Sequence, residues 1–407
     1  MPAPSKQQFG PLAGVKVLDL TMYMAGPTCG LMLADLGADV IKLEKIPGGD
    51  DARRLTPPTI GGHAASFMVM NRNKRGIAVD LKKPEGVRIL KRLVRSADIL
   101  IENFRPGTLE KLGVGYDVLA KENPALVFGS ITGFGSTGPL SGRGGLDLIA
   151  QGFSGLMSIT GEGPGRPPVK VGAPVSDTTS GMLLALGVVS AYVNRLKTGK
   201  GQFVETSLIE AAISHTYWQA AIFLATGESS GPMGSAHPLT SPYQAYKCSD
   251  GYMVLGAPNQ INWARLCNAI GASDLIEKKE FVDLPSRRRN NEDLTAALEA
   301  VMGKHTRAHW IEKLEAVGVP CGAVNSIAEA FTHPHTIARD MVVDIGDEKS
   351  GPVKTVGCPI KLSRTNSKVA SLAPHLGEHT REVLLEAGMD DNEIAELKAS
   401  GAIHCPN

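Results

Sequence analysis

The chain has 407 residues, of which 43% are hydrophobic, so it is long enough for two domains with packed interiors. Its 42 Lys and Arg nearly balance its 41 Asp and Glu, which leaves no overall field to attract nucleic acid or an acidic membrane. Aromatic residues make up only 5% and are not interleaved with basic ones, as a surface that stacks on nucleic-acid bases would require. These features exclude nucleic acid and membrane surfaces as expected partners.

The six cysteines are scattered, with no CxxC pair and no Cys/His cluster at metal-ligand spacing. We therefore expect reduced thiols, no bound metal and a cytoplasmic location. The opening MPAPSKQQFG lacks the apolar core of a signal peptide, and no apolar run reaches the ~18–20 residues of a membrane span.

The first elements predict a strand, helix, strand unit of a parallel sheet. Val15–Leu20 is typical of a buried strand, Met24–Pro27 of a small-residue turn, Thr28–Leu36 of a helix and Val40–Glu44 of a second strand. A dinucleotide site is disfavoured, because the first turn contains only Gly26 and lacks the three-glycine fingerprint.

Further strands are predicted at Ile77–Leu81, Ile99–Asn103 and Leu126–Ile131, with a helix at Pro84–Ser96. A G-x-G-x-x-G match follows the last of these at Gly133, Gly135 and Gly138, but a Pro and a loop come next instead of a helix. Without a helix N-terminus the motif loses its phosphate-binding mechanism, so we interpret it as a flexible loop near the site.

Asp177 opens a run that predicts a long buried helix, with Met182, Leu183, Leu186, Val189, Ala191 and Val193 as its apolar members. Gly199 and Gly201 end this helix, and Phe203–Leu208 alternates like a short strand. Asp177 could be a simple N-cap, which is the usual role of an Asp before a helix. It could also be a carboxylate nucleophile, because the positive end of the helix dipole favours the ionised form.

A domain boundary is predicted after the apolar helix that runs from Ile209 to about Thr226, where a Gly, Ser and Pro-rich linker begins. We expect a larger domain in residues 1–226, the linker and a smaller mixed domain in 227–317, and a return to the larger domain in 318–407. The last part should contain strands within Pro352–Leu362 and helices at Glu378–Ala387 and Asp391–Ser400.

Several motifs in order along nearly the whole chain resemble one family. They are LDLTMYMAGP (18–27), LADLGADVIKLEKIPGGD (33–50), NRNKRGIAVDLKKPEG (71–86), ADILIENFRPGTLEKLGVGY (97–116), DTTSGM (177–182), GVPCGAVNSIAEA (318–330) and LGEHTREVL (376–384). The chain resembles the class III coenzyme A (CoA) transferases of the CaiB/BaiF type, which include formyl-CoA transferase. The resemblance implies an α/β fold, with a Rossmann-like larger domain made from both ends of the chain, a smaller α/β domain and an interlocked homodimer.

The resemblance also implies the chemistry and its residues. Asp177 would be acylated during transfer of CoA between an acyl-CoA and a small carboxylic acid, with CoA thioesters as substrates and no permanently bound cofactor. The implied CoA-binding residues are Met24, Ala25, Lys45, Arg72, Lys74, Arg75, Asn103, Phe104, Arg105 and Lys111. The implied substrate and oxyanion residues are Gly234, Ser235, Ala236 and His237.

These assignments have simpler alternatives. NRNKR (71–75) could be a solvated loop, Phe104 a core residue, Lys111 a surface lysine and His237 a structural histidine. The sequence also departs from some members of the family, which carry Gln at the position of Met24 and Tyr at that of Leu146.

The segment GSAHPLTSPYQAY is similar to relatives that act on succinyl-CoA and small dicarboxylic acids, so we expect succinyl-CoA as the donor. One alternative is an α-methylacyl-CoA racemase, which would need a base in Thr132–Leu146, where no His stands. The other is an inactive CoA-binding protein, but Asp177 is retained in its motif.

Overall fold

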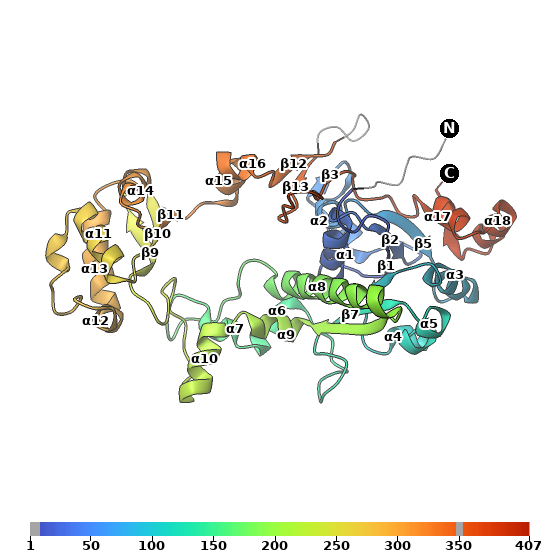
Figure 1. The fold of residues 1–407 in the computed structure, drawn as a ribbon, viewed down its shortest axis with the longest axis horizontal. Helices are drawn as coiled ribbons and strands as arrows, with labels where there is room; N and C mark the ends of the chain where they lie inside the picture. Colours follow the sequence, from blue (N-terminus) through green and yellow to red (C-terminus); the bar gives the residue numbers. More distant parts are fainter. Residues whose placement is uncertain (1–8, 347–352, 407) are drawn as a thin grey trace. The chain divides into compact units, whose positions relative to one another are not determined.

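The computed structural model describes residues 9–346 and 353–406. Most of the N-terminal decapeptide, and Pro352 at the start of the predicted C-terminal strands, lie outside these residues. The chain forms two compact units (Figure 1). The larger contains the chain up to Ser154, Val171–His215 and the chain from Pro334 on, and the smaller contains Gly155–Lys170 and Thr216–His333.

A seven-stranded sheet forms the centre of the larger unit, in the order β14-β5-β2-β1-β6-β7-β8. Its strands are β1 (Lys16–Asp19), β2 (Asp39–Glu44), β5 (Arg75–Val79), β6 (Ile99–Glu102), β7 (Val127–Thr132), β8 (Gln202–Ser207) and β14 (Ile403–His404). All neighbours are parallel except β14, which is antiparallel to β5. If the six parallel strands are numbered by appearance, their order is 3-2-1-4-5-6, the Rossmann-type order. In this order ligands bind outside the C-terminal ends of the strands, where the strand order reverses between β1 and β6.

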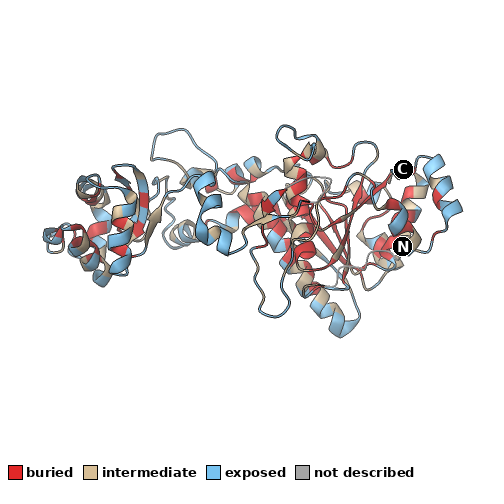
Figure 2. Ribbon diagram, turned by 90° about the horizontal axis from the view of Figure 1, so that it is seen from above, coloured by how far each residue is buried: buried red, intermediate tan, exposed pale blue. Residues whose placement is uncertain are grey.

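Helices cover both faces of this sheet, so its inner strands are buried on both sides (Figure 2). Leu18 and Leu20 of the β1 region pack on one face with the helices α3 (Pro84–Val94), α5 (Tyr116–Glu122), α17 (Thr380–Glu386) and α18 (Asp391–Ala399). Val17, which directly precedes Leu18, packs on the other face with α1 (Ala25–Asp35), α8 (Val175–Thr198) and α9 (Leu208–Ser214). The sequence prediction of an α/β protein with a mainly parallel sheet is confirmed.

Smaller elements complete this unit. They are η1 (Asp51–Arg54), β3 (Thr59–Ile60), β4 (His63–Ala64), α2 (Ala65–Met70), α4 (Thr108–Lys111), α6 (Asp147–Phe153), α16 (Pro334–Ala338), β12 (Val342–Asp344) and β13 (Lys354–Val356).

The apolar members that predicted a buried α8 are in part on its outer face. Leu184, Ala185 and Val188 face the sheet, whereas Leu186 is 66% exposed. Met182, Leu183 and Val193 are exposed as well. The prediction of the helix is confirmed, but the expected burial of these side chains is wrong for the isolated chain, because α8 is apolar on two faces and the sheet covers one.

The smaller unit contains a three-stranded antiparallel sheet of β9 (Tyr243–Cys248), β10 (Gly251–Gly256) and β11 (Cys321–Ala323). Trp263, Leu298 and Trp310 are buried in its core. Its helices are α7 (Leu156–Ile159), α10 (Tyr217–Thr226), α11 (Gln260–Ile270), η2 (Ser273–Leu275), α12 (Leu284–Arg289), α13 (Asn291–Met302), α14 (Arg307–Ala316) and α15 (Ile327–Thr332).

The limits of the two units differ from the expected ones. The single helix predicted from Ile209 to Thr226 is two helices, α9 and α10, and the units divide between them at His215 and Thr216. The segment 318–326 stays with the smaller unit, because β11 pairs with β10. In the described part of the chain, no helix is long and apolar enough to cross a membrane.

Candidate active site

Asp177 lies in the first turn of α8, two residues inside the helix. The N-cap position belongs to Pro174, and no side chain caps the helix, so the N-cap alternative for Asp177 is wrong. Among the described residues, its half-buried carboxylate has no hydrogen-bond or ion-pair partner. Asp177 is therefore available to react.

The surroundings of Asp177 make its carboxyl less acidic than usual. Burial, and after it the negative charge of Asp147, raise the pKa of Asp177 to about 6. Burial and Asp147 therefore outweigh the stabilisation of the anion that the helix dipole was expected to give. At pH 7 the carboxylate is still mostly ionised, and its greater basicity suits a nucleophile.

Asp147 is fixed in place at the start of α6. Its Oδ1 accepts a hydrogen bond from the Ser176 main-chain N–H at 2.9 Å, and its Oδ2 accepts one from Gln151 Nε2 at 2.7 Å. Gln151 is fully buried, and its Oε1 accepts from Val171 N–H at 2.9 Å. A hydrogen-bonded chain thus ties the second carboxylate to the residue that precedes Asp177.

Gly181 brings the start of α8 against the start of α1. A Cβ atom at Gly181 would lie 2.5 Å from the carbonyl oxygen of Ala25 and 2.7 Å from Cβ of Thr28, so a larger residue would push the helices apart. Asp177 precedes Gly181 by about one helical turn. The structure therefore places Asp177 about one helical turn from the contact between Gly181 and Ala25, which with Met24 was expected beside the pantetheine arm.

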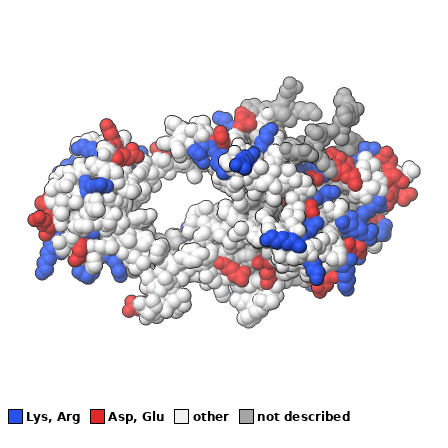
Figure 3. All heavy atoms as spheres, viewed as in Figure 1, with Lys and Arg blue, Asp and Glu red and all other residues white. Residues whose placement is uncertain are grey.

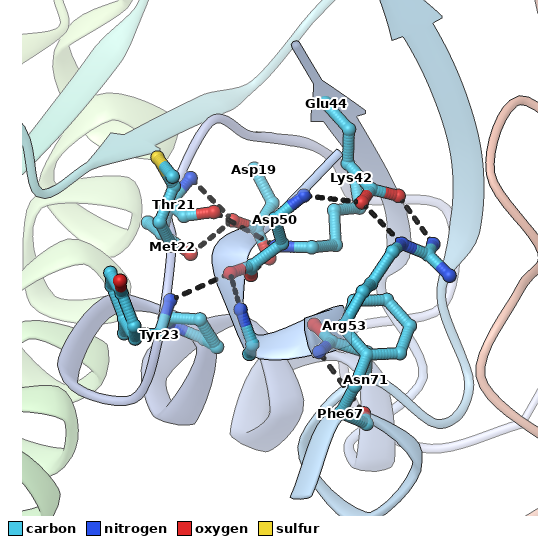
Figure 4. Close-up of polar contacts among 12 residues, drawn as sticks. Asp19, Thr21, Met22, Tyr23, Lys42, Glu44, Asp50, Arg53, Phe67 and Asn71 are labelled. Atoms are coloured by element: carbon cyan, nitrogen blue, oxygen red, sulfur yellow. Dashed lines mark hydrogen bonds and ion pairs between the residues drawn. The ribbon is translucent and has the colours of Figure 1, made fainter. Parts of the chain in front are cut away.

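The turn between β1 and α1 is held by side chains (Figure 4). Asn103, which follows β6, accepts from the Met22 main-chain N–H at 2.8 Å and donates to the Met22 carbonyl oxygen at 2.9 Å. The side chain of Asn103, expected to contact CoA, is thus used by the protein itself. The turn lies at the C-terminal end of β1, where the strand order reverses between β1 and β6, which is the usual ligand site of such a sheet.

The basic segment NRNKR is not a solvated loop. Arg72 and Lys74 are buried, Arg72 in an ion pair with Asp35 at 2.6 Å and Lys74 in one with Asp19 at 2.8 Å. Arg75 begins β5, at the opposite sheet edge from the β1–α1 turn, and pairs with Asp39 at 2.7 Å. The three cations are therefore balanced by acidic residues of the larger unit and are not grouped in one open patch.

Three other predicted cations are exposed near the C-terminal ends of the strands. Lys45 follows β2 and pairs with Asp51 at 2.9 Å. Arg105 lies against Gly144, with its guanidinium 3.5 Å from the position of a Cβ there, and Lys111 ends α4. These three side chains are accessible to phosphate groups.

Phe104 is half-buried and packs against the core, as its alternative role required. Its main-chain N–H donates to Glu102 Oε2 at 2.8 Å. Glu102 ends β6, and burial raises the pKa of its carboxyl to about 7. Phe104 and Glu102 thus shape the turn that carries Arg105.

Gly234, Ser235, Ala236 and His237 lie in the smaller unit, and several of their polar groups are already hydrogen-bonded. Gly234 N–H donates to Gly161 O at 2.8 Å, and Ala236 N–H donates to Met233 O at 3.1 Å. Ser235 Oγ accepts from Ala245 N–H at 3.0 Å. In this conformation, the main-chain N–H groups of Gly234 and Ala236 are not free to stabilise an oxyanion.

His237 is held in one tautomer by its neighbours. Its Nδ1 accepts from Leu239 N–H at 3.1 Å, which assigns the proton of the neutral ring to Nε2. Its ring packs edge-to-face between Trp218 and Tyr243, with centroids 5.8 and 5.3 Å away. The free Nε2–H can donate to a carboxylate.

Comparison with known proteins decides the family. The model of CoA-transferase family III matches residues 12–380. The chain belongs to CoA-transferase family III. This confirms the resemblance found in the sequence and identifies the protein as a CoA-transferase.

Relatives match this CoA-transferase over almost its whole length. An acyl-CoA transferase of Fusarium pseudograminearum is 38% identical and covers 97% of this chain and 88% of its own. The succinyl-CoA:glutarate CoA-transferase of Mus musculus is 36% identical and covers 97% of this chain and 90% of its own. A crystal structure of a CaiB/BaiF family protein from Brucella suis has a TM-score of 0.83 and 38% identity, covering 93% of this chain and all of that one.

Leu146 adds to the evidence against a racemase. It precedes Asp147, is 71% exposed and carries no group that could move a proton. The segment Thr132–Leu146, where a racemase would need its base, thus contains no His, Asp or Glu, and Asp147 lies just beyond it.

Sequence reasoning missed Asp147, beside Asp177, and two residues that bond to the β1–α1 turn: Lys42, at the Thr21 carbonyl oxygen, and Asp50, at the Tyr23 N–H. Lys42 had a visible signal, because a lysine in the middle of the buried strand DVIKLE must find a partner for its charge. Asp147 had a weaker one, as an acidic residue in the first turn of a helix. Their partners Thr21, Tyr23 and Ser176 are 21, 27 and 29 residues away and could not be read from spacing.

Proposed function

We propose that this CoA-transferase moves CoA from succinyl-CoA to a small dicarboxylic acid, with Asp177 as its nucleophile. The observation that carries the proposal is the unpaired, half-buried carboxylate of Asp177, one helical turn from the contact between α8 and the start of α1. The name of the Mus musculus relative supports the donor and the class of acceptor.

The reaction needs two exchanges at Asp177. Its carboxylate attacks the thioester carbonyl carbon of succinyl-CoA, the C–S bond breaks and the CoA thiolate leaves, which forms a mixed anhydride. The thiolate then attacks the aspartyl carbonyl, releasing succinate and leaving a thioester between Asp177 and CoA. The acceptor carboxylate attacks this thioester, the C–S bond breaks and the CoA thiolate leaves, which forms a second mixed anhydride. The thiolate then attacks the acceptor carbonyl of that anhydride, which yields the new acyl-CoA and restores the Asp177 carboxylate.

The CoA moiety would bind along the C-terminal edge of the sheet. We assign the pantetheine arm to Met24 and Ala25, and the phosphates to Lys45, Arg105 and Lys111, whose side chains are exposed there. Arg72, Lys74, Arg75, Asn103 and Phe104 would support this site through the contacts described above, since their polar groups are engaged within the protein.

His237 would donate its Nε2–H to a carboxylate of the acceptor. A neutral imidazole donor binds a carboxylate without requiring acidic pH. The other groups of the Gly234–Ala236 segment would contribute as oxyanion donors only after their present hydrogen bonds are exchanged for the substrate.

A second copy of the chain would complete the enzyme as an interlocked homodimer. None of the ten residues of α10, YWQAAIFLAT, is buried, and Leu224 is 82% exposed. The surface over α10 in Figure 3 is almost free of charge. In the larger unit, Leu186 of α8 is likewise 66% exposed, and neighbouring exposed apolar side chains of this kind are typical of surfaces that a partner covers.

The test is transfer of CoA from succinyl-CoA to a panel of carboxylic acids, read by the mass of the acyl-CoA products. We expect conversion of dicarboxylic acids by the wild type, none by Asp177→Ala, and normal conversion by Asp117→Ala, a matched exposed Asp in the first turn of α5. Hydroxylamine trapping should modify Asp177 in the wild type and in Asp117→Ala, and should give no such modification in Asp177→Ala.

Two results would contradict the proposal. Activity with formyl-CoA and oxalate but none with succinyl-CoA would refute the donor. Deuterium incorporation at the α-carbon of an acyl-CoA in heavy water, with no acid converted, would replace transfer by racemisation.

A further inference from the structure

The turn from Thr21 to Tyr23 is bonded almost entirely to side chains (Figure 4). Its successive main-chain polar groups, from the N–H of Thr21 to the N–H of Tyr23, meet Asp19, Lys42, Asn103 and Asp50. Tyr23 adopts a left-handed conformation, with φ of 63°, which is unfavourable for a residue with a side chain. The turn therefore depends on these side chains to keep its shape.

Lys42 and Asp50 join two points of this turn. Lys42 Nζ donates to the carbonyl oxygen of Thr21 at 2.8 Å and lies 3.0 Å from Asp50 Oδ2 in an ion pair. Asp50 Oδ1 accepts from Tyr23 N–H at 3.0 Å and from Ala52 N–H at 2.9 Å. The ammonium and the carboxylate thus close a ring with the main chain of the turn.

Neighbouring residues fix Asp50 in turn. Asp50 N–H donates to Glu44 Oε2 at 2.9 Å, and Glu44 forms an ion pair with Arg53 at 2.6 Å. Apart from the ion pair with Lys42, Asp50 Oδ2 has no hydrogen-bond partner among the described residues. The carboxylate of Asp50 is therefore fixed in place, with one oxygen directed at the turn and the other at Lys42.

The charges are deeply buried and balanced. The side chains of Lys42, Asp50, Lys74 and Asp19 are fully inaccessible, two cations against two anions. Burial alone would lower the pKa of Lys42, but the carboxylates of Asp19, Asp50 and Glu44 raise it, so Lys42 stays charged. A buried ion pair is often no more stabilising than apolar side chains of the same size. Its presence under this turn therefore points to a role other than stability.

We propose that Lys42 and Asp50 are positioning residues, which hold the turn so that the start of α1 presents the substrate thioester to Asp177. The inference rests on the proposed function and adds residues that touch no substrate. Lys42 bonds to Thr21 and Asp50 bonds to Tyr23. This turn leads directly into α1, where the carbonyl oxygen of Ala25 lies against Gly181, one helical turn from Asp177. A displaced turn leaves CoA bound but places the carbonyl carbon badly for attack.

The test compares Asp50→Asn and Lys42→Met with Asp98→Asn. Asp98 forms a partly buried ion pair with Arg195 at 2.7 Å, next to the start of β6 and therefore at the opposite sheet edge. We expect the first two variants to lower kcat at least tenfold with the KM for succinyl-CoA within threefold. We also expect faster formation of the Asp177 thioester in the control than in either variant, in single-turnover mixing.

Hydrogen–deuterium exchange of residues 20–25 provides a readout that does not depend on activity. The amides of this peptide should exchange faster in both variants than in the wild type or in Asp98→Asn. If a single variant fails to fold, the charge-neutral double variant Lys42→Met with Asp50→Leu takes its place with the same expectations.

The proposal would be overturned if both variants kept the amide exchange rates and kcat of the wild type. It would also be overturned if only the KM for succinyl-CoA changed, or if kcat fell no further than it does in Asp98→Asn. If the wild type transfers no CoA, the proposed function fails, while the exchange data still decide whether Lys42 and Asp50 hold the turn.

Discussion

Replacing Asp177 by Asn should abolish transfer and at the same time stabilise the protein at neutral pH. The pKa of Asp177 is raised from 3.8 to about 6, so folding disfavours its ionised form. At about 1.4 kcal/mol per unit of pKa shift, ionisation of Asp177 lowers the free energy of unfolding by up to about 3 kcal/mol. We expect about 2 kcal/mol, because solvent screens a carboxylate that is only half-buried. Removing the charge should return this free energy.

The pH dependence has a definite sign. Because the folded pKa lies above the unfolded one, the cost is absent below pH 4, grows between pH 4 and 6 and is complete at pH 7. Differential scanning fluorimetry should therefore show an increase in Tm of about 3 °C for Asp177→Asn at pH 7 and of less than about 1 °C at pH 4.

Asp117→Asn is the matched control, since Asp117 is exposed in the first turn of another helix. Its Tm should stay close to that of the wild type, or fall slightly through loss of a favourable helix-dipole interaction. If the Tm of Asp177→Asn at pH 7 is equal to or below that of the wild type, burial and Asp147 do not destabilise the ionised carboxylate of Asp177.

Three further outcomes are expected. Asp147→Asn should lower the pKa of Asp177 and move the acidic limb of the kcat–pH profile to lower pH, and an unmoved limb would contradict the coupling. Arg105→Ala should raise the KM for succinyl-CoA about tenfold with kcat within twofold, and the loss should shrink at high salt. Leu186→Glu in α8 and Leu224→Glu in α10 should each convert the proposed dimer to a monomer, as measured by light scattering. An unchanged molecular mass would argue against α8 and α10 as the interface.

The strands of the sheet could be predicted to within a few residues, because each is a short apolar run bounded by turn residues. Val40–Glu44 was expected and Asp39–Glu44 is found, and similar agreement holds at Ile99. The break between α9 and α10 was not predicted, because the run from Ile209 to Thr226 contains neither Gly nor Pro. The break falls at its polar residues Ser214, His215 and Thr216, which a continuous helix would also accommodate.

A site residue could be predicted where a local sequence motif marks it. It could not be predicted where its role depends on ion-pair partners from distant segments. Asp177 stands in a motif that the sequence displays. Nothing local to Arg72 and Lys74, in contrast, indicates that Asp35 and Asp19 neutralise them. Charged residues look alike in sequence whether they are solvated or buried in pairs, because burial is decided by elements that meet only in the fold.

The turn at Thr21–Tyr23 also bears on when the enzyme becomes competent during synthesis. Met22 is bonded to Asn103, 81 residues further along the chain, while Lys42 and Asp50 come from the segment between them. A nascent chain therefore lacks a formed turn until β6 has been made and added beside β1. Contacts of such long range form late in folding, so this part of the active site matures with the sheet as a whole and not with its first strand and helix.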